Sequence, residues 1–181
     1  MSKQHHTQTK PPVFPAAYAI EGFFKKLTEL MAYIGIGALI LAIIVVVGDI
    51  IWRRVGGGSF IGAVDLTQFS LVAAAAWSIP FAFANHNHVT VDLLSDVFPV
   101  QFKRMLDAIA ALCGAGLTGF LLWLCWGRAM EIFNYGDVSQ DLALPLIIPW
   151  AFLLSGLLIS CLVSLVNAAI FLTVKERIYG E

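Results

Sequence analysis

Four long apolar runs without a charged residue constrain this chain of 181 residues more than any other feature of its sequence. About 20 apolar residues in a helix cross the hydrocarbon core of a bilayer, which is about 30 Å thick. Charged residues make up only 13% of the chain, against roughly 25% in soluble domains. The sequence therefore predicts an all-α integral membrane protein with four transmembrane helices. The uncharged runs are residues 30–48, 66–84, 108–127 and 142–174.

The distribution of lysine and arginine predicts how these spans are oriented. Cytoplasmic loops of membrane proteins carry an excess of both residues. Eight of the 11 lie in the N-terminal tail, in the loop between the second and third spans, and at the C-terminus, and three lie in the other two loops. This bias places both termini in the cytoplasm. Four tryptophans fall at the outer ends of the spans in this topology, as expected of an interfacial belt: Trp52, Trp123, Trp126 and Trp150.

The chain divides into two tails, an amphipathic segment and the membrane domain. Residues 1–15 are polar and predict a disordered cytoplasmic tail. In residues 16–29 apolar and charged side chains alternate with the period of a helix, which predicts an amphipathic helix lying in the membrane interface; a cytoplasmic extension of the first span is the alternative. Residues 30–174 form the four-helix domain, and 175–181 a cytoplasmic tail. The expected spans are residues 30–52, 66–84, 105–127 and 149–174.

The inner loop between the second and third spans contains most of the unusual chemistry. A short apolar face before Pro99 predicts a short interfacial helix there, which the proline ends. His86 and His88 lack a carboxylate or thiolate partner at helical spacing, so they do not make up a metal or haem ligand set. We interpret them as polar residues at headgroup level, and we expect no metal and no cofactor.

Rows of small residues mark the helix faces that pack closely in lipid. In the fourth span Gly156, Ser160, Ser164 and Ala168 follow one another at four-residue spacing, and Ala111, Ala115 and Gly119 do so in the third. Either row could seal the four helices together or bind a partner subunit, with internal packing slightly favoured. Near the middle of the second span, Trp77 is expected to pack against another helix. Pro80 predicts a kink whose freed carbonyl a neighbouring group must satisfy, and the fourth helix is expected to begin near Pro149.

The charged residues exclude several functions. A proton or ion pathway needs an ionisable group within the membrane, yet Asp49 and Asp107 lie at the ends of their runs. A small four-helix exporter would need an embedded carboxylate, and a membrane cytochrome would need histidines that face each other within the bilayer; the four histidines all lie outside the spans. The net charge of −1 gives no indication of a nucleic-acid partner. The three cysteines lie inside apolar runs without metal-binding spacing.

The inner loop resembles a known family. The segment His88-Val89-Thr90-Val91-Asp92-Leu93-Leu94, followed by Pro99 and a basic pair, is similar to the motif H-[IV]-x-V-D-L-L…P of the small, DctQ-like membrane subunit of tripartite ATP-independent periplasmic (TRAP) transporters. The similarity extends to Trp77 and to the proline-containing residues 142–150, and covers roughly residues 30–173. The chain departs from the family pattern just before the histidine, where Asn85, His86 and Asn87 replace a frequent basic residue.

This resemblance implies a function without catalysis. In such transporters a large membrane subunit, the M component, contains the substrate and sodium sites, and a periplasmic binding protein delivers an organic acid anion. The small subunit braces the large one in the bacterial inner membrane, in contact with membrane lipids. The resemblance marks His88, Val91, Asp92 and Pro99 as the family motif. It does not name the substrate.

Overall fold

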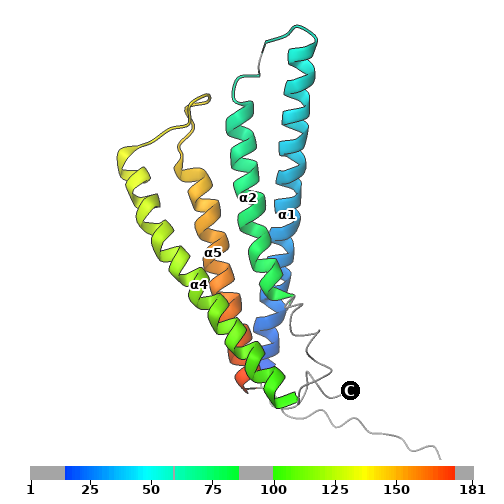
Figure 1. Cartoon of the computed structure of the whole chain (residues 1–181), viewed down its shortest axis with the longest axis vertical. Helices are drawn as coiled ribbons and strands as arrows, with labels where there is room; N and C mark the ends of the chain where they lie inside the picture. The colour runs from blue at the N-terminus through cyan, green and yellow to red at the C-terminus, as the bar shows by residue number, and fades with distance from the viewer. Residues whose placement is uncertain (1–14, 59, 86–99, 174–181) are drawn as a thin grey trace, which may run out of the picture.

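A computed structural model describes residues 15–58, 60–85 and 100–173 of the chain (Figure 1). Four helices make up most of these residues, and each is long and apolar enough to cross a membrane. The prediction of an all-α chain with four spans is thus confirmed. The helices are α1 (Pro15–Arg54), α2 (Ala63–Ala84), α4 (Val100–Tyr135) and α5 (Ile147–Thr173). The tails and the inner-loop motif, at residues 1–14, 86–99 and 174–181, lie outside the described residues.

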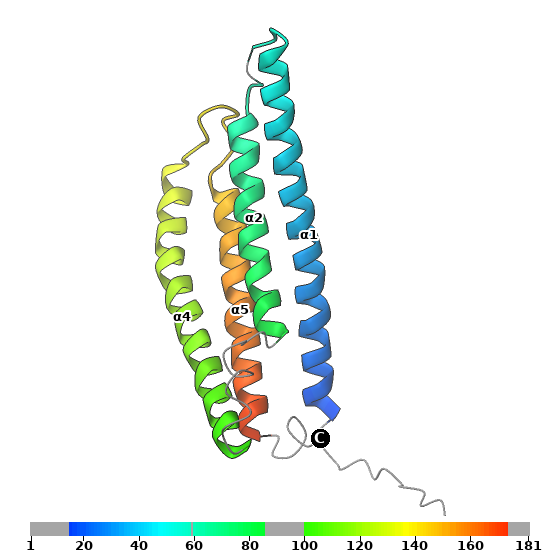
Figure 2. The same cartoon turned by 45° about the vertical axis from the view of Figure 1, so that its right-hand side comes forward.

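The four helices form an open layer in the order α1, α2, α5, α4 (Figures 1 and 2). Helix α2 packs between α1 and α5, and α5 packs between α2 and α4. Within the described part of the chain, the backbone of α4 approaches neither α1 nor α2. The layer therefore consists of two helical hairpins, α1–α2 and α4–α5, joined along α2 and α5. Both hairpin loops lie at the same end, which we call the two-loop end (Figure 1).

Helix α1 packs on α2 through a seam that repeats every seven residues. Thr28, Gly35, Ala42 and Asp49 are buried at this spacing, the pattern that keeps one face of a helix against a straight neighbour. Gly35 makes the closest approach, because a Cβ at this position would lie 3.3 Å from the carbonyl oxygen of Ala74. Small residues at the seam thus bring the two backbones together.

Helix α1 is much longer than a bilayer is thick. Its 40 residues span about 60 Å at the rise of an α-helix, twice the hydrocarbon core. The helix runs without a break from residues 16–29 into the first span, which is the geometry of the extension considered as the alternative to a separate amphipathic helix. The interfacial position of residues 16–29 stays a prediction.

The other helices also extend beyond the expected spans. Helix α4 continues from the expected end at residue 127 to Tyr135, through an exposed ion pair between Arg128 and Glu131. Such charged side chains are solvated outside hydrocarbon, so the last two turns of α4 are suited to water or headgroups. Helix α5 begins at Ile147, and Pro149 therefore lies in its first turn, where a proline interrupts no helical hydrogen bond.

Candidate functional site: the α2–α5 junction and the two-loop end

The middle of α2 is a run of four alanines that lets both neighbouring helices approach closely. Ala74 faces Gly35 of α1, and Ala76 faces Gly156 of α5. Ala76 is 1% exposed, although its side chain is a single methyl group. Sequence reasoning noted the small residues of the third and fourth spans but missed residues 73–76, whose composition is itself the signal.

Gly156 contacts the one α2 carbonyl that Pro80 leaves without its helical donor. Proline has no N–H, so the carbonyl of Ala76, four residues earlier, lacks the usual hydrogen bond. A Cβ on Gly156 would overlap this carbonyl, so a Cα hydrogen of the glycine points at its oxygen. Weak Cα–H···O contacts of this kind recur between closely packed helices. The freed carbonyl expected from Pro80 thus lies against the first residue of the α5 row.

Trp77 adds a polar and an aromatic contact to the same junction. Its indole Nε1–H donates to the hydroxyl of Ser155 at 3.1 Å, and that hydroxyl in turn donates to the carbonyl of Phe152 at 2.8 Å. The rings of Trp77 and Phe152 meet edge to face with centroids 5.2 Å apart. Both the N–H and the ring of Trp77 therefore contact α5, and edge-to-face is a favourable arrangement for an aromatic pair.

The remaining members of the α5 row are buried inside the layer. Ser160 is fully buried and donates to the carbonyl of Gly156 at 2.8 Å. Ser164 is 1% exposed, and its hydroxyl has no hydrogen-bond partner among the residues that the structure describes. Ala168 lies farther along α5 in a cluster with Ala108 and Ala111 of α4. The row therefore passes from α2 at Gly156 to α4 at Ala168.

The small residues of the third span lie on the α4–α5 seam. Ala111 and Ala115 are buried, and a Cβ at Gly119 would lie 3.5 Å from Sγ of Cys161. The Cys161 thiol donates to the carbonyl of Ala115 at 3.6 Å, a weak bond between helices. No disulfide forms among the three cysteines, which are all free.

Asn167 ties α5 to the last turn of α2. Its side-chain Nδ2 donates to the carbonyl of Phe83 at 2.8 Å, one of the terminal carbonyls that a helix leaves without an internal donor. Asn167 is buried, and its amide would be costly in hydrocarbon without this bond. Sequence reasoning missed this residue, although an asparagine in an otherwise apolar span is a visible signal.

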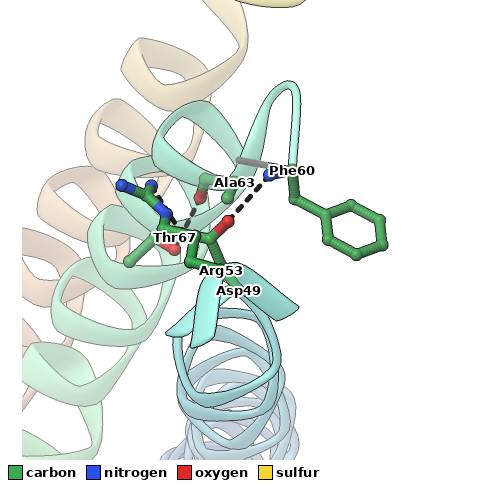
Figure 3. A network of polar contacts seen from close by, with 5 residues as sticks. All are labelled: Asp49, Arg53, Phe60, Ala63 and Thr67. Atoms are coloured by element: carbon green, nitrogen blue, oxygen red, sulfur yellow. Dashed lines mark hydrogen bonds and ion pairs between the residues drawn. The ribbon is translucent and has the colours of Figure 1, made fainter. Parts of the chain in front are cut away.

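Two aspartates hold the loops at the two-loop end. Asp49 of α1 pairs with Arg53 at 2.6 Å and accepts the backbone N–H of Phe60 at 2.8 Å (Figure 3). Because Phe60 belongs to the α1–α2 loop, this carboxylate fixes the loop to the helix that precedes it. Asp49 is thus a structural residue at the end of its span, as its position at the boundary predicts.

Asp65 of α2 holds the α4–α5 loop in place by hydrogen bonds. This residue was not identified from the sequence. One oxygen of this buried carboxylate accepts the hydroxyl of Ser139 at 2.6 Å and the backbone N–H groups of Leu142 at 2.8 Å and Asp141 at 3.2 Å. Asp65 lies in the first turn of α2, where the helix dipole also favours a negative charge. The side chain of Leu142 covers Gly62, whose φ of 87° suits a glycine. One carboxylate therefore joins the two hairpins.

The inner-loop motif residues His88, Val91, Asp92 and Pro99 lie outside the described residues, so the geometry here concerns the helices and the two-loop end. In the part of the chain that is described, no three histidine, cysteine or acidic side chains gather as a metal site would require. We call the contacts described above, which join the helices and loops of this chain to one another, the scaffold contacts.

Comparison with known proteins decides the family. The model of "Tripartite ATP-independent periplasmic transporters, DctQ component" matches residues 42–173, which include the C-terminal part of α1 from Ala42 onward and all of α2, α4 and α5. The chain belongs to the DctQ family. Over 100 residues, 55% of its length, it is 23% identical to the isethionate TRAP transporter permease protein DctMQ of Oleidesulfovibrio alaskensis. The match covers only 16% of that protein. No solved structure matches the chain.

Membership of the DctQ family makes the chain a component of a TRAP transporter. The family match includes the Ala-rich centre of α2, the α5 row, Asp49 and Asp65, so most of the scaffold contacts lie within the family domain. The family expected from the sequence is thereby confirmed over residues 42–173.

Proposed function

We propose that this chain is the small permease subunit of a TRAP transporter and that it braces a large membrane subunit. The large subunit would carry out sodium-coupled uptake of an organic acid anion, which a periplasmic binding protein delivers. Two findings support this proposal: the DctQ family match, and a relative in which the similar segment makes up 16% of a longer TRAP permease. The small subunit itself has no enzymatic role in this proposal.

The observation that carries the proposal is that three buried polar side chains bond to the chain's own helices and loops, although the buried Ser164 hydroxyl has no such partner among the described residues. Ser160, Asn167 and Asp65 each make a hydrogen bond within the chain. A carrier that works by alternating access needs polar groups free for its substrate near the middle of the membrane. An exporter would need an embedded carboxylate, whereas both Asp49 and Asp65 hold loops at the two-loop end. Asp107, which is also buried, lies near the start of α4, toward the opposite end of the layer (Figure 1). A brace requires only the internal contacts that are present.

Orientation and location follow from the same proposal. The two-loop end would face the periplasm and both termini the cytoplasm of a bacterial inner membrane, because eight of the 11 basic residues lie toward the opposite end. Trp52 and Trp123 are more than half exposed, as residues in contact with lipid headgroups would be. Lipids would therefore cover the parts of the layer that no protein covers.

Affinity purification of the tagged chain from its native membranes in mild detergent tests this function. We expect a larger, many-helix permease subunit to be recovered with it at a fixed ratio. A homogeneous assembly of this chain alone would contradict the brace and favour an exporter. Stoichiometric haem or zinc in the preparation would contradict it in favour of a redox subunit; a His86→Ala, His88→Ala variant with unchanged yield and spectrum is the corresponding control.

A further inference from the structure

One face of α2 stays uncovered although α2 lies inside the layer. The exposed side carries the large apolar residues Val64, Leu71 and Ile79 together with four small or polar residues, Gln68, Ala75, Ser78 and Ala82, which follow one another at intervals of seven, three and four. We call these four residues the α2 outer face. Intervals of three and four place them along one stripe of the helix. The stripe points away from α1 and α5, since Ala74 and Ala76 face those helices.

The α2 outer face differs in composition from the exposed sides of the neighbouring helices. Exposed positions on α1 and α5 are mostly isoleucine and leucine, such as Ile43, Ile44, Leu158 and Leu162. On α2, Val64, Leu71 and Ile79 are exposed as well, but beside them the α2 outer face presents two methyl groups, a hydroxyl and a carboxamide. Mean hydropathy shows the same contrast, with 1.4 for the span in α2 against 2.9 in α1 and 2.0 and 2.1 in α4 and α5. The least apolar of the four spans thus exposes a side on which small and polar residues alternate with large apolar ones.

Two properties of this face favour a protein partner over lipid. Small residues allow another helix backbone to approach closely, and dispersion contacts between such helices drive association in a bilayer. In addition, the Gln68 carboxamide has no hydrogen-bond partner in the described parts of the chain. An amide with its hydrogen bonds unmade is costly in hydrocarbon, whereas a donor or acceptor on a neighbouring helix would satisfy it.

We propose that the α2 outer face is the surface on which a transmembrane helix of the large permease subunit packs. The inference rests on the proposed function and names where on this chain the brace acts. The occupant is indicated by the DctMQ relative, because the segment similar to this chain is joined there to the remaining, much longer part of one permease polypeptide. Ala75 and Ser78 form the point of closest approach, with Gln68 as the polar contact.

The substitution Ala75→Leu tests the proposal in the tagged chain expressed with the large subunit. Ala75 is exposed, so the larger side chain meets no other part of the chain and the variant should fold. Gly37→Leu on α1 is the matched control, since Gly37 is also exposed and has no atom of another residue within 4 Å of its Cβ position. Elution as a single species and an unchanged thermal midpoint of the purified chain establish folding for both.

We expect Ala75→Leu to lower recovery of the large subunit by about tenfold or more, the effect of overpacking a close contact, and Gly37→Leu to leave recovery unchanged. A photo-crosslinking amino acid at Ser78 should give an adduct whose mass is that of this chain plus the large subunit. Wild-type recovery with Ala75→Leu, or a Ser78 adduct with lipid or with a second copy, would overturn this surface assignment. In this experiment the proposed function itself fails if the wild-type chain recovers no large subunit, an outcome that is distinct from an effect of Ala75→Leu.

Discussion

At the scale of single residues, Gly156 shows how little room the α2–α5 junction leaves. The atoms that a Cβ would meet belong to the backbone of Ala76, which cannot turn away as a flexible side chain could. The same carbonyl is unbonded within its own helix because of Pro80. Glycine at position 156 therefore allows close packing, and it places a Cα–H group, a weak donor, against the Ala76 carbonyl oxygen, which lacks its helical donor.

Gly156→Ala should consequently force α5 away from α2. We expect a loss of about 1–3 kcal/mol in the free energy of unfolding, the usual cost of overpacking a tight contact. Thermal unfolding of the purified chain in detergent, followed by circular dichroism, measures it. Gly116→Ala on α4 is the control, because Gly116 is exposed and its Cβ would meet nothing within 4 Å. Equal midpoints for the two variants would mean that the helices at Ala76 are not closely packed.

Ser160 gives a second test of the row on α5. Its side chain is fully buried and its hydroxyl bonds only to the preceding turn. Leucine at this position adds bulk that costs about 1–3 kcal/mol, whereas the lost hydroxyl bond is worth only about 0.6 kcal/mol on average in a membrane interior. Steric overlap should dominate, so Ser160→Leu should destabilise the chain even without its partner.

Expression level and monodispersity of the chain produced alone are the readouts for Ser160→Leu. The control is Leu158→Ile, at an exposed position of the same helix, which should change neither. A monodisperse Ser160→Leu chain that merely fails to recover the large subunit would show that the row faces the partner instead of the chain's own interior.

At the scale of elements, the α4–α5 loop is held by a helix from the other hairpin. Asp65 accepts three hydrogen bonds from residues 139–142, and Ser139 also accepts the N–H of Leu144 and donates its own N–H to the carbonyl of that residue. The loop thus has a fixed shape at the two-loop end. It gives the two hairpins a second contact, in addition to the contact between Gly156 and Ala76 in the middle of α5 and α2.

Asp65→Ala should release this loop without unfolding the helices. Hydrogen exchange measured by mass spectrometry should become faster in peptides that contain Leu142 and Leu144, because the carboxylate that accepts from Leu142 and from the Ser139 hydroxyl is gone. Peptides from the middle of α5 should exchange as before. Asp137→Ala is the control, since Asp137 is exposed and contributes its backbone carbonyl to the loop. Unchanged exchange in the Asp65 variant would contradict the role of this carboxylate.

The elements also show what the sequence could and could not predict. Uncharged runs identified all four helices, because length and hydropathy alone decide which segments cross a bilayer. The helix ends were less predictable: α4 continues past Arg128, since a charge ends the apolar run but not the helix. The sequence also could not predict which helices pack against each other, because small residues, which mark packing faces, occur on every helix. Contacts such as Asp65 with Ser139 join residues far apart in sequence, and no local pattern marks them.

At the scale of the whole molecule, an open layer of four helices suits a protein that supports another. A closed bundle would bury its helix faces against each other, whereas among the four described helices only α2 and α5 have a closely packed neighbour on both sides. The lengths of α1 and α4, which are 40 and 36 residues, exceed a span of about 20 residues. Both helices therefore project from the bilayer, and the direction in which each projects depends on the topology.

Cysteine accessibility tests this topology. The three native cysteines lie within α4 and α5, so they are replaced by alanine to give a silent background. Cysteines introduced at Gly57 and Asp137, in the two loops, should react in intact cells with a thiol reagent that crosses the outer but not the inner membrane. Cysteines at Lys26, on the opposite projection of α1, and at Asp96, which lies outside the described residues, should react only after the inner membrane is permeabilised.

The physical reason for this outcome is the asymmetry of the basic residues, which resist transfer across the inner membrane. Gly57 and Asp137 report on one end of the layer through different hairpins, so they must agree with each other if both loops lie at that end. Labelling of Lys26 and Asp96 in intact cells, with none at the loops, would invert the layer. It would also place the loops held by Asp49 and Asp65 in the cytoplasm, where a periplasmic binding protein could not reach them.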